Sequence, residues 1–97
     1  MKVVWSPLAL EKLEATAKFI SLDKPSAAAK WVNDIFDHSD LLSFQPELGR
    51  EIPELLGSNY REIIFGNYRI IYKIENEIKI LTLRNSRQLL NSGNIEL

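Results

Sequence analysis

Apolar and polar positions alternate along the chain from residue 60 to residue 84, YREIIFGNYRIIYKIENEIKILTLR. The β-branched and aromatic residues of this stretch suit a pleated, half-buried surface. Two turn signals divide it: Gly66-Asn67, and the acidic segment 75–77 with its central asparagine. The pattern therefore predicts three antiparallel strands joined by two tight hairpins.

A two-residue loop at Gly66-Asn67 predicts the register of the first hairpin, with Phe65 opposite Tyr68. Residues paired across an antiparallel ladder point to the same face of the sheet. One face, mostly apolar, should then carry Arg61, Ile63, Phe65, Tyr68, Ile70, Tyr72 and Ile74. The other should carry Tyr60, Glu62, Ile64, Arg69, Ile71 and Lys73.

The second hairpin decides which way the last strand faces. An even-length loop, at Glu75-Asn76 or at Asn76-Glu77, places Leu81 and Leu83 on the first face. It places on the second face Ile78, Ile80, Thr82 and Arg84. Three cations would then gather on the second face, namely Arg69, Lys73 and Arg84. This prediction depends on loop parity, because a one-residue slip moves every side chain of a strand to the opposite face.

Two helices are predicted before the strands. Residues 2–5 form a short strand candidate, and Ser6-Pro7 reads as N-cap and first helical position. Apolar residues then recur at helical spacing over 8–22, and a second helix should run over about 26–43. A short break between two helices predicts an antiparallel hairpin, whose apolar faces need the apolar face of the sheet as partner.

These elements predict an α+β fold of order β-α-α-β-β-β, with an N-terminal helical hairpin packed on one face of a small, mainly antiparallel sheet. A chain of 97 residues fits one domain over 1–97. Residues 44–59 should form an ordered connector, and about 91–97 a mobile tail.

Composition narrows the class of protein. The chain has no cysteine, which excludes disulfides and thiolate chemistry. No run resembles a signal peptide or a bilayer span, so we expect a cytoplasmic protein without membrane contact. The net charge is −1 and the pI about 5.8, which does not favour a general nucleic-acid binder. The charge is uneven, because residues 1–59 carry −3 and residues 60–97 carry +2.

Several short motifs follow one another along nearly the whole chain: Trp5-Ser6-Pro7-x-Ala9, Pro25-x-Ala27-Ala28, Pro46-x-Leu48-Gly49-Arg50, Ile52-Pro53-Glu54-Leu55, Tyr60-Arg61-Glu62, Gly66-x-Tyr68-Arg69-Ile70-Ile71-Tyr72 and Arg84-x-x-Arg87. In this order the chain resembles the ParE/RelE superfamily of bacterial toxins from type II toxin–antitoxin (plasmid stabilisation) systems.

The resemblance implies the same β-α-α-β-β-β fold. It also implies a small toxin that a cognate antitoxin neutralises, with a toxin–antitoxin hetero-oligomer as a possible assembly. ParE-like members are associated with inhibition of DNA gyrase. RelE-like members cleave mRNA in the ribosomal A site.

A RelE-like ribonuclease needs cationic groups for the phosphate and an acid and a base for the attacking and leaving oxygens. Arg69 resembles by position a phosphate-stabilising arginine of that group, and Arg84 a second, so both are catalytic candidates. A guanidinium presents a fixed fork to oxyanions, which fits a phosphate clamp. Candidates for the acid and the base are sparse, because residues 88–97 contain no Tyr, His, Lys or Arg. Ribosome-bound mRNA is therefore the second hypothesis for the target.

A ParE-like protein needs a binding surface rather than an active site. Residues 84–87 stand where ParE-like members show a His-Gly-Arg-Arg-type segment, and this chain keeps only the last arginine and has Arg84 in place of the histidine. The leading hypothesis is a gyrase-binding toxin without catalysis, cofactor or metal. Its target-binding candidates are Arg69, Lys73, Arg84 and Arg87. A third hypothesis is an inactive member retained as an interaction module.

Structural explanations compete with these roles. Arg61 suits a structural anchor at the start of its strand, and Arg69 could instead form a salt bridge with Glu62 across the hairpin. Arg50 and Glu54 would organise the connector.

Asp34 and His38 lie four residues apart on the second helix, a spacing that could suggest a metal. Without a third ligand motif, a solvated acidic face is the preferred interpretation. Trp31 is predicted at the edge of the core.

Overall fold

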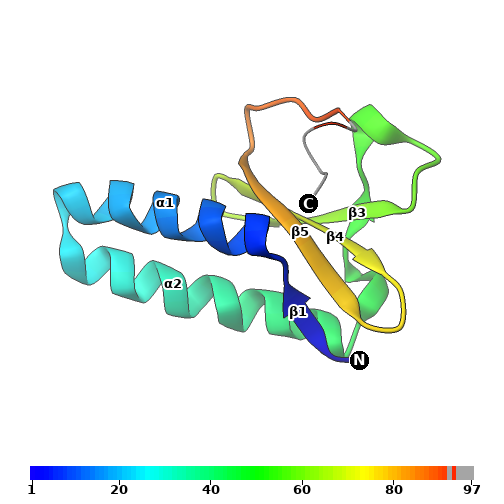
Figure 1. Ribbon diagram of the computed structural model, residues 1–97, viewed down its shortest axis with the longest axis horizontal. Helices are drawn as coiled ribbons and strands as arrows, with labels where there is room; N and C mark the ends of the chain where they lie inside the picture. Colours follow the sequence, from blue (N-terminus) through cyan, green and yellow to red (C-terminus); the bar gives the residue numbers. More distant parts are fainter. Residues whose placement is uncertain (92, 94–97) are drawn as a thin grey trace.

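A computed structural model describes residues 1–91 and 93. Two long helices lie beside a five-stranded sheet, and their far ends extend beyond it (Figure 1). The elements are β1 (Val3–Trp5), α1 (Pro7–Asp23), α2 (Pro25–Asp40), β2 (Arg50–Glu51), β3 (Tyr60–Phe65), β4 (Tyr68–Ile74) and β5 (Ile78–Asn85), with 3-10 turns at Leu41–Ser43, Pro46–Leu48 and Pro53–Leu55. The predicted tail at about 91–97 lies, apart from Asn91 and Gly93, outside the described residues.

The strand order in the sheet is β1-β5-β4-β3-β2. β1 runs parallel to β5, and the other neighbours are antiparallel. The α+β class and the predicted element order are thus confirmed. The two-residue strand β2, which pairs with β3, was not predicted, because it carries no alternating pattern of its own.

Local sequence signals account for the helix boundaries. Ser6 Oγ accepts a hydrogen bond from the Ala9 amide over 3.1 Å, and Pro7 occupies the first helical position, as predicted. Pro25 starts α2 directly after the extended Lys24. α2 is shorter than predicted, because residues 41–43 tighten into a 3-10 turn.

The first hairpin has the predicted register. Phe65 pairs with Tyr68 and Ile63 with Ile70 across the two-residue turn. Gly66 adopts φ 58°, a left-handed conformation that glycine reaches without strain. The two faces predicted for β3 and β4 follow from this register.

The second hairpin differs from the prediction. Its loop has three residues, because Ile74 pairs with Ile78, so Ile78 and Ile80 face the helices instead of the opposite side. A β-bulge then leaves Leu81 between the pairs Tyr72–Ile80 and Ile71–Thr82. The extra residue reverses the parity, so Leu83 returns to the helix side.

Three further residues of β5 lie on the second face of the sheet. Thr82 and Arg84 pair with Ile71 and Arg69, and therefore lie on the second face as predicted. The predicted place of Leu81 was wrong, because the bulge turns it to the second face.

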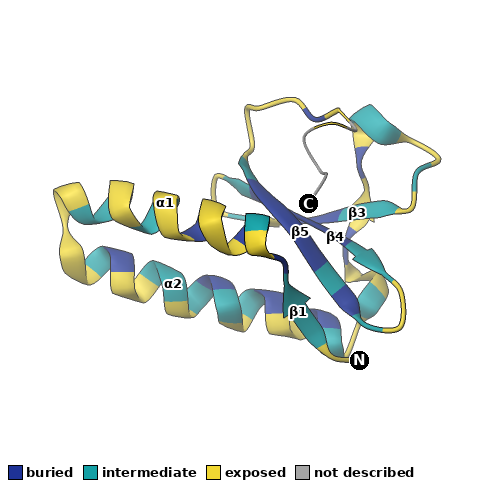
Figure 2. Cartoon of the chain, viewed as in Figure 1, coloured by how far each residue is buried: buried dark blue, intermediate teal, exposed yellow. Residues whose placement is uncertain are grey.

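Two apolar clusters lie on the two sides of the sheet. The helix-side cluster joins Ala9, Leu13, Ile35 and Leu42 to the first face, and Trp31 packs at its edge with its ring 5.4 Å from that of Tyr68, as predicted. The second cluster consists of Ile52, Ile71, Leu81 and Leu90. β4 and β5 are consequently the most buried strands (Figure 2). In the described part of the chain, no helix has the length and apolarity needed to cross a membrane.

Candidate functional site

The second face of the sheet holds a network of paired charges centred on the buried Arg69. The guanidinium of Arg69 donates through Nε to Glu62 Oε1 over 2.6 Å. It binds Glu54 with both outer nitrogens, at 2.7 Å and 2.9 Å. Arg69 is 4% exposed and Glu62 is 1% exposed, so this charge pair is removed from water. The predicted Arg69–Glu62 salt bridge is therefore confirmed.

Residues of the connector and of its short strand β2 extend this network of charges. Arg50, in β2, binds the second oxygen of Glu62 through Nε and Nη2, both at 2.8 Å. Arg61 donates to the Gly49 carbonyl oxygen over 2.7 Å. The structural roles predicted for Arg50, Arg61 and Glu54 are thus confirmed, and two guanidiniums balance two carboxylates.

Protonation equilibria reflect this pairing. The hydrogen bond from Arg69 lowers the pKa of Glu54 to about 2, against the opposing effect of burial, and the Leu90 amide lowers it further. The hydrogen bond to Glu54 in turn raises the pKa of Arg69. Both groups therefore stay charged at neutral pH.

The phosphate clamp predicted from Arg69 and Arg84 is not formed. The two arginines share the second face of the sheet, as predicted, and they are direct cross-strand partners, although the loop predicted for this hairpin was wrong. However, the Arg69 guanidinium lies buried between Glu62 and Glu54, which already occupy the fork that a phosphate would need. Arg69, which is 4% exposed and paired on both sides, is therefore not available to touch a phosphate or a protein target.

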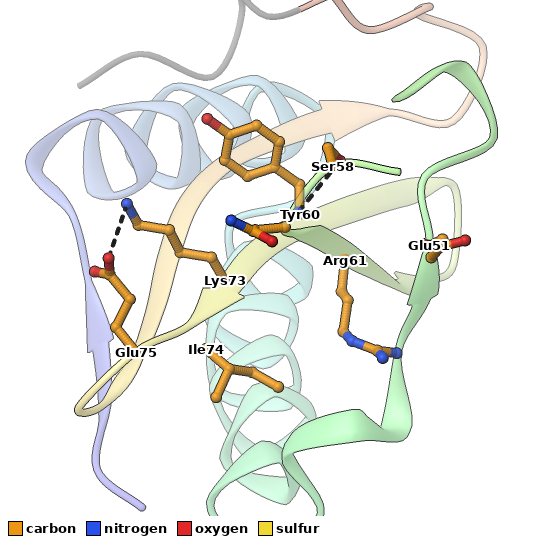
Figure 3. Close-up of a pocket in the computed structure, with 8 residues that line it drawn as sticks. Glu51, Ser58, Tyr60, Arg61, Lys73, Ile74 and Glu75 are labelled. Carbon is orange, nitrogen blue, oxygen red and sulfur yellow. Dashed lines mark hydrogen bonds and ion pairs between the residues drawn. The ribbon is translucent and has the colours of Figure 1, made fainter. Parts of the chain in front are cut away.

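Lys73 lies on the same face but at the other end of β4. It is four residues from Arg69, or about 13 Å along the strand. It lines a hollow of about 420 Å³ with Ser58, Asn59 and Tyr60. Its ammonium extends toward Glu75, 3.4 Å away, while Arg61 lies apart from it (Figure 3). The predicted cluster of three cations is therefore divided into two separate places.

Arg84 lies near the end of β5, and Arg87 lies in the tight turn that follows the strand; we call residues 84–87 the basic turn. The Ser86 amide donates to the Asn67 carbonyl oxygen over 2.7 Å, and the Arg87 amide donates to Asn85 Oδ1 over 3.0 Å. Among the described residues, neither arginine has a carboxylate within ion-pair distance. Arg84 is half-buried and its Nη2 donates to the Leu89 carbonyl oxygen over 3.4 Å, whereas Arg87 is exposed. The basic turn thus carries two cations that no carboxylate of the described residues pairs.

The segment after the basic turn was missed as part of the site. Leu90 is 5% exposed and packs in the second cluster, and its amide donates to Glu54 Oε2 over 2.9 Å. The pair Leu89-Leu90 after a polar turn was the only sequence signal for this contact. This apolar pair is too short to indicate which surface of the fold it packs against.

The pair Asp34 and His38 is accounted for by neighbouring side chains. Asp34 forms an ion pair with Lys30, and the ring of His38 lies 5.3 Å from that of Phe65. Among the described residues, no group of three or more His, Asp or Glu could hold a metal ion.

The fold and the basic turn together define a class, the small α+β toxins of the ParE/RelE type. A family model described as "ParE toxin of type II toxin-antitoxin system, parDE" matches residues 3–90. The chain belongs to this ParE toxin family.

Two similar proteins agree with this assignment. The protein named "Putative toxin Y4kP" of Sinorhizobium fredii (strain NBRC 101917 / NGR234) is 33% identical over 89 residues, which cover 90% of each chain. A solved structure titled "Chromosomal ParDE TA system from P. aeruginosa" matches with a TM-score of 0.72. It is 24% identical and covers 88% of this chain and 95% of its own, so it supports the fold.

Proposed function

We propose that this ParE-family toxin acts in the cytoplasm by binding DNA gyrase through the basic turn, and that a cognate antitoxin neutralises it. The observation that carries the proposal is the pair Arg84 and Arg87, two cations of the basic turn for which residues 1–91 and 93 provide no carboxylate within ion-pair distance. Arginine is enriched among the residues that dominate protein–protein binding energy. Lys73 belongs to the proposal as a separate, weaker contact, because Glu75 offsets its charge.

The burial of Arg69 in ion pairs favours a binding function over mRNA cleavage. A RelE-like clamp needs that guanidinium free, and here it is buried against two carboxylates. The sequence after it, residues 88–97, offers no Tyr, His, Lys or Arg for proton transfer. The function that fits is therefore recognition of a protein surface.

The antitoxin would cover the helical hairpin. Three large apolar side chains on α1 are exposed, Leu10 at 45%, Phe19 at 72% and Leu22 at 84%. The last two lie near the far end of α1, which extends beyond the sheet (Figure 1). Phe19 and Leu22 lie three positions apart and therefore share one face of α1, so an amphipathic helix laid along this end of the hairpin would bury both.

The test is DNA supercoiling by purified gyrase in the presence of the protein. We expect the wild-type chain to inhibit and the Arg84→Ala/Arg87→Ala variant to lose at least about tenfold in potency, since truncation of one hot-spot residue costs about 2 kcal/mol or more and a tenfold change needs about 1.4 kcal/mol. The matched control is Lys18→Ala/Lys30→Ala, which removes the same charge from the helices, where both lysines are exposed. It should inhibit as the wild type does.

Absence of inhibition by a folded, monodisperse wild-type sample would refute gyrase as the target. Cleavage of ribosome-bound mRNA would then be assayed next. A chain that also fails to slow bacterial growth when expressed without an antitoxin would indicate an inactive interaction module.

A further inference from the structure

The segment that follows the basic turn lies across the second face of the sheet as a strap, which we define as residues 88–90. In Figure 1 the chain after β5 curves away from the strand end toward the 3-10 turn Pro53–Leu55. Leu89 is 77% exposed, whereas Leu90 is 5% exposed in the second apolar cluster. The strap is thus fixed by its last residue.

One ion pair holds the backbone of the strap at two points. Arg69 Nη1 donates to the Gln88 carbonyl oxygen over 3.1 Å. Glu54 Oε2 accepts from the Leu90 amide over 2.9 Å and from Arg69 Nη1 over 2.7 Å. The strap has no strand neighbour and no helix of its own, so hydrogen bonds replace secondary structure as its support. Besides the bonds to Glu54 and Arg69, the Gln88 amide donates to the Asn85 carbonyl oxygen over 2.9 Å, and Arg84 Nη2 donates to the Leu89 carbonyl oxygen over 3.4 Å.

The basic turn lies between two fixed points. β5 holds it on one side through the pairs Arg69–Arg84 and Tyr68–Asn85. The strap holds it on the other side, starting at Gln88, directly after Arg87. An arginine side chain on a free chain end would sample many positions, and fixing its backbone in advance removes that entropy cost from binding.

We propose that Glu54 and Arg69 are positioning residues, which clamp the strap and thereby fix the backbone that presents Arg84 and Arg87. This inference rests on the proposed function for its binding consequence, but the clamp itself is measurable without any target. It assigns to Arg69 a role at the binding surface that requires no contact with the partner.

Trypsin provides the direct readout, because it cuts after Arg87 only when the backbone on both sides of that residue can detach from the protein and extend in the protease's active site. We compare wild type, Glu54→Gln and the control Glu47→Gln, whose glutamate is exposed in the turn Pro46–Leu48. Glu54→Gln should be cut after Arg87 about tenfold faster, since a charged hydrogen bond becomes a neutral one. Cutting at Arg61 and Lys73, inside β3 and β4, should stay unchanged, and Glu47→Gln should match wild type.

Three outcomes would overturn the clamp. The first is equal cleavage after Arg87 in all three proteins. The second needs no variant: amide hydrogen exchange of Leu90 in the wild-type protein at the rate of an unstructured peptide. A rise in cleavage at Arg61 and Lys73 equal to that at Arg87 would also overturn it, because it would indicate loss of the whole fold.

The gyrase assay separates the clamp from the proposed function. Glu54→Gln should inhibit supercoiling several-fold less than wild type. Normal inhibition by a variant with a released strap would overturn the positioning role. If the wild-type protein itself does not inhibit gyrase, the proposed target fails, and the protease and exchange experiments still decide whether the clamp exists.

Discussion

Replacement of Arg69 by methionine should destabilise the fold far more than loss of any surface cation. The substitution leaves Glu62, whose side chain is fully buried, without its closest counter-charge. Breaking a buried ion pair from one side costs about 3–5 kcal/mol. The lower end applies here, because Arg50 still binds the other oxygen of Glu62, and Glu54 is 21% exposed and can regain water.

A loss of about 3 kcal/mol is large for a chain of this size, since stabilities near 5–15 kcal/mol are usual for domains. It corresponds to a fall in melting temperature of about 12–24 °C. Urea unfolding followed by tryptophan fluorescence measures it directly, with Trp5 and Trp31 as probes. Lys79→Met is the matched control, because Lys79 pairs with Glu75 at a surface where both are more than 40% exposed. It should cost less than about 1 kcal/mol.

The double variant Arg69→Met/Glu62→Leu tests the cause. With both charges replaced by apolar groups, no unpaired buried charge is left, and most of the stability should return. Two results would refute the reasoning: Arg69→Met no more destabilising than Lys79→Met, or a double variant as unstable as the sum of the two single ones.

Other predictions concern hydrogen bonds that join distant segments. Tyr72→Phe should cost about 1–3 kcal/mol, because the buried hydroxyl donates to the Pro46 carbonyl oxygen and accepts from the Gly49 amide. Urea unfolding checks it against Tyr68→Phe, whose hydroxyl forms no hydrogen bond with the part of the chain that the structure describes. Ser6→Ala should cost about 1–2 kcal/mol, because Ser6 Oγ caps α1 and also donates to the Leu81 carbonyl oxygen; Ser21→Ala on the exposed side of α1 should cost little. The pKa of Glu54 is lowered to about 2 from 4.5, so the stability that its carboxylate contributes is complete above about pH 4.5 and is lost as the pH falls through about 2. Wild type should therefore exceed Glu54→Gln in stability by about 2 kcal/mol at pH 7, and a gap that stays constant down to pH 2 would contradict this assignment.

Local sequence determined the helices and the first hairpin of this protein. Ser6-Pro7 marks the start of α1 and Gly66-Asn67 closes a two-residue turn, and both signals act within a few residues. Given that turn, the alternation of β3 and β4 fixed which side chains face the helices. The α+β class and the element order followed, because an apolar helical hairpin and a sheet with one apolar face can bury their surfaces only against each other.

Tertiary structure alone decided which side of the sheet each β5 side chain occupies and which carboxylates pair with Arg69. The three-residue loop and the bulge at Leu81 are favoured because they bury Ile78 and Ile80 under the helices and Leu81 beside Leu90, and no local pattern specifies both. Arg69 likewise takes Glu54 as its partner from fifteen residues earlier in the chain. Which carboxylate reaches a buried guanidinium depends on how the connector folds over the sheet, and that is set by long-range packing rather than by neighbouring residues.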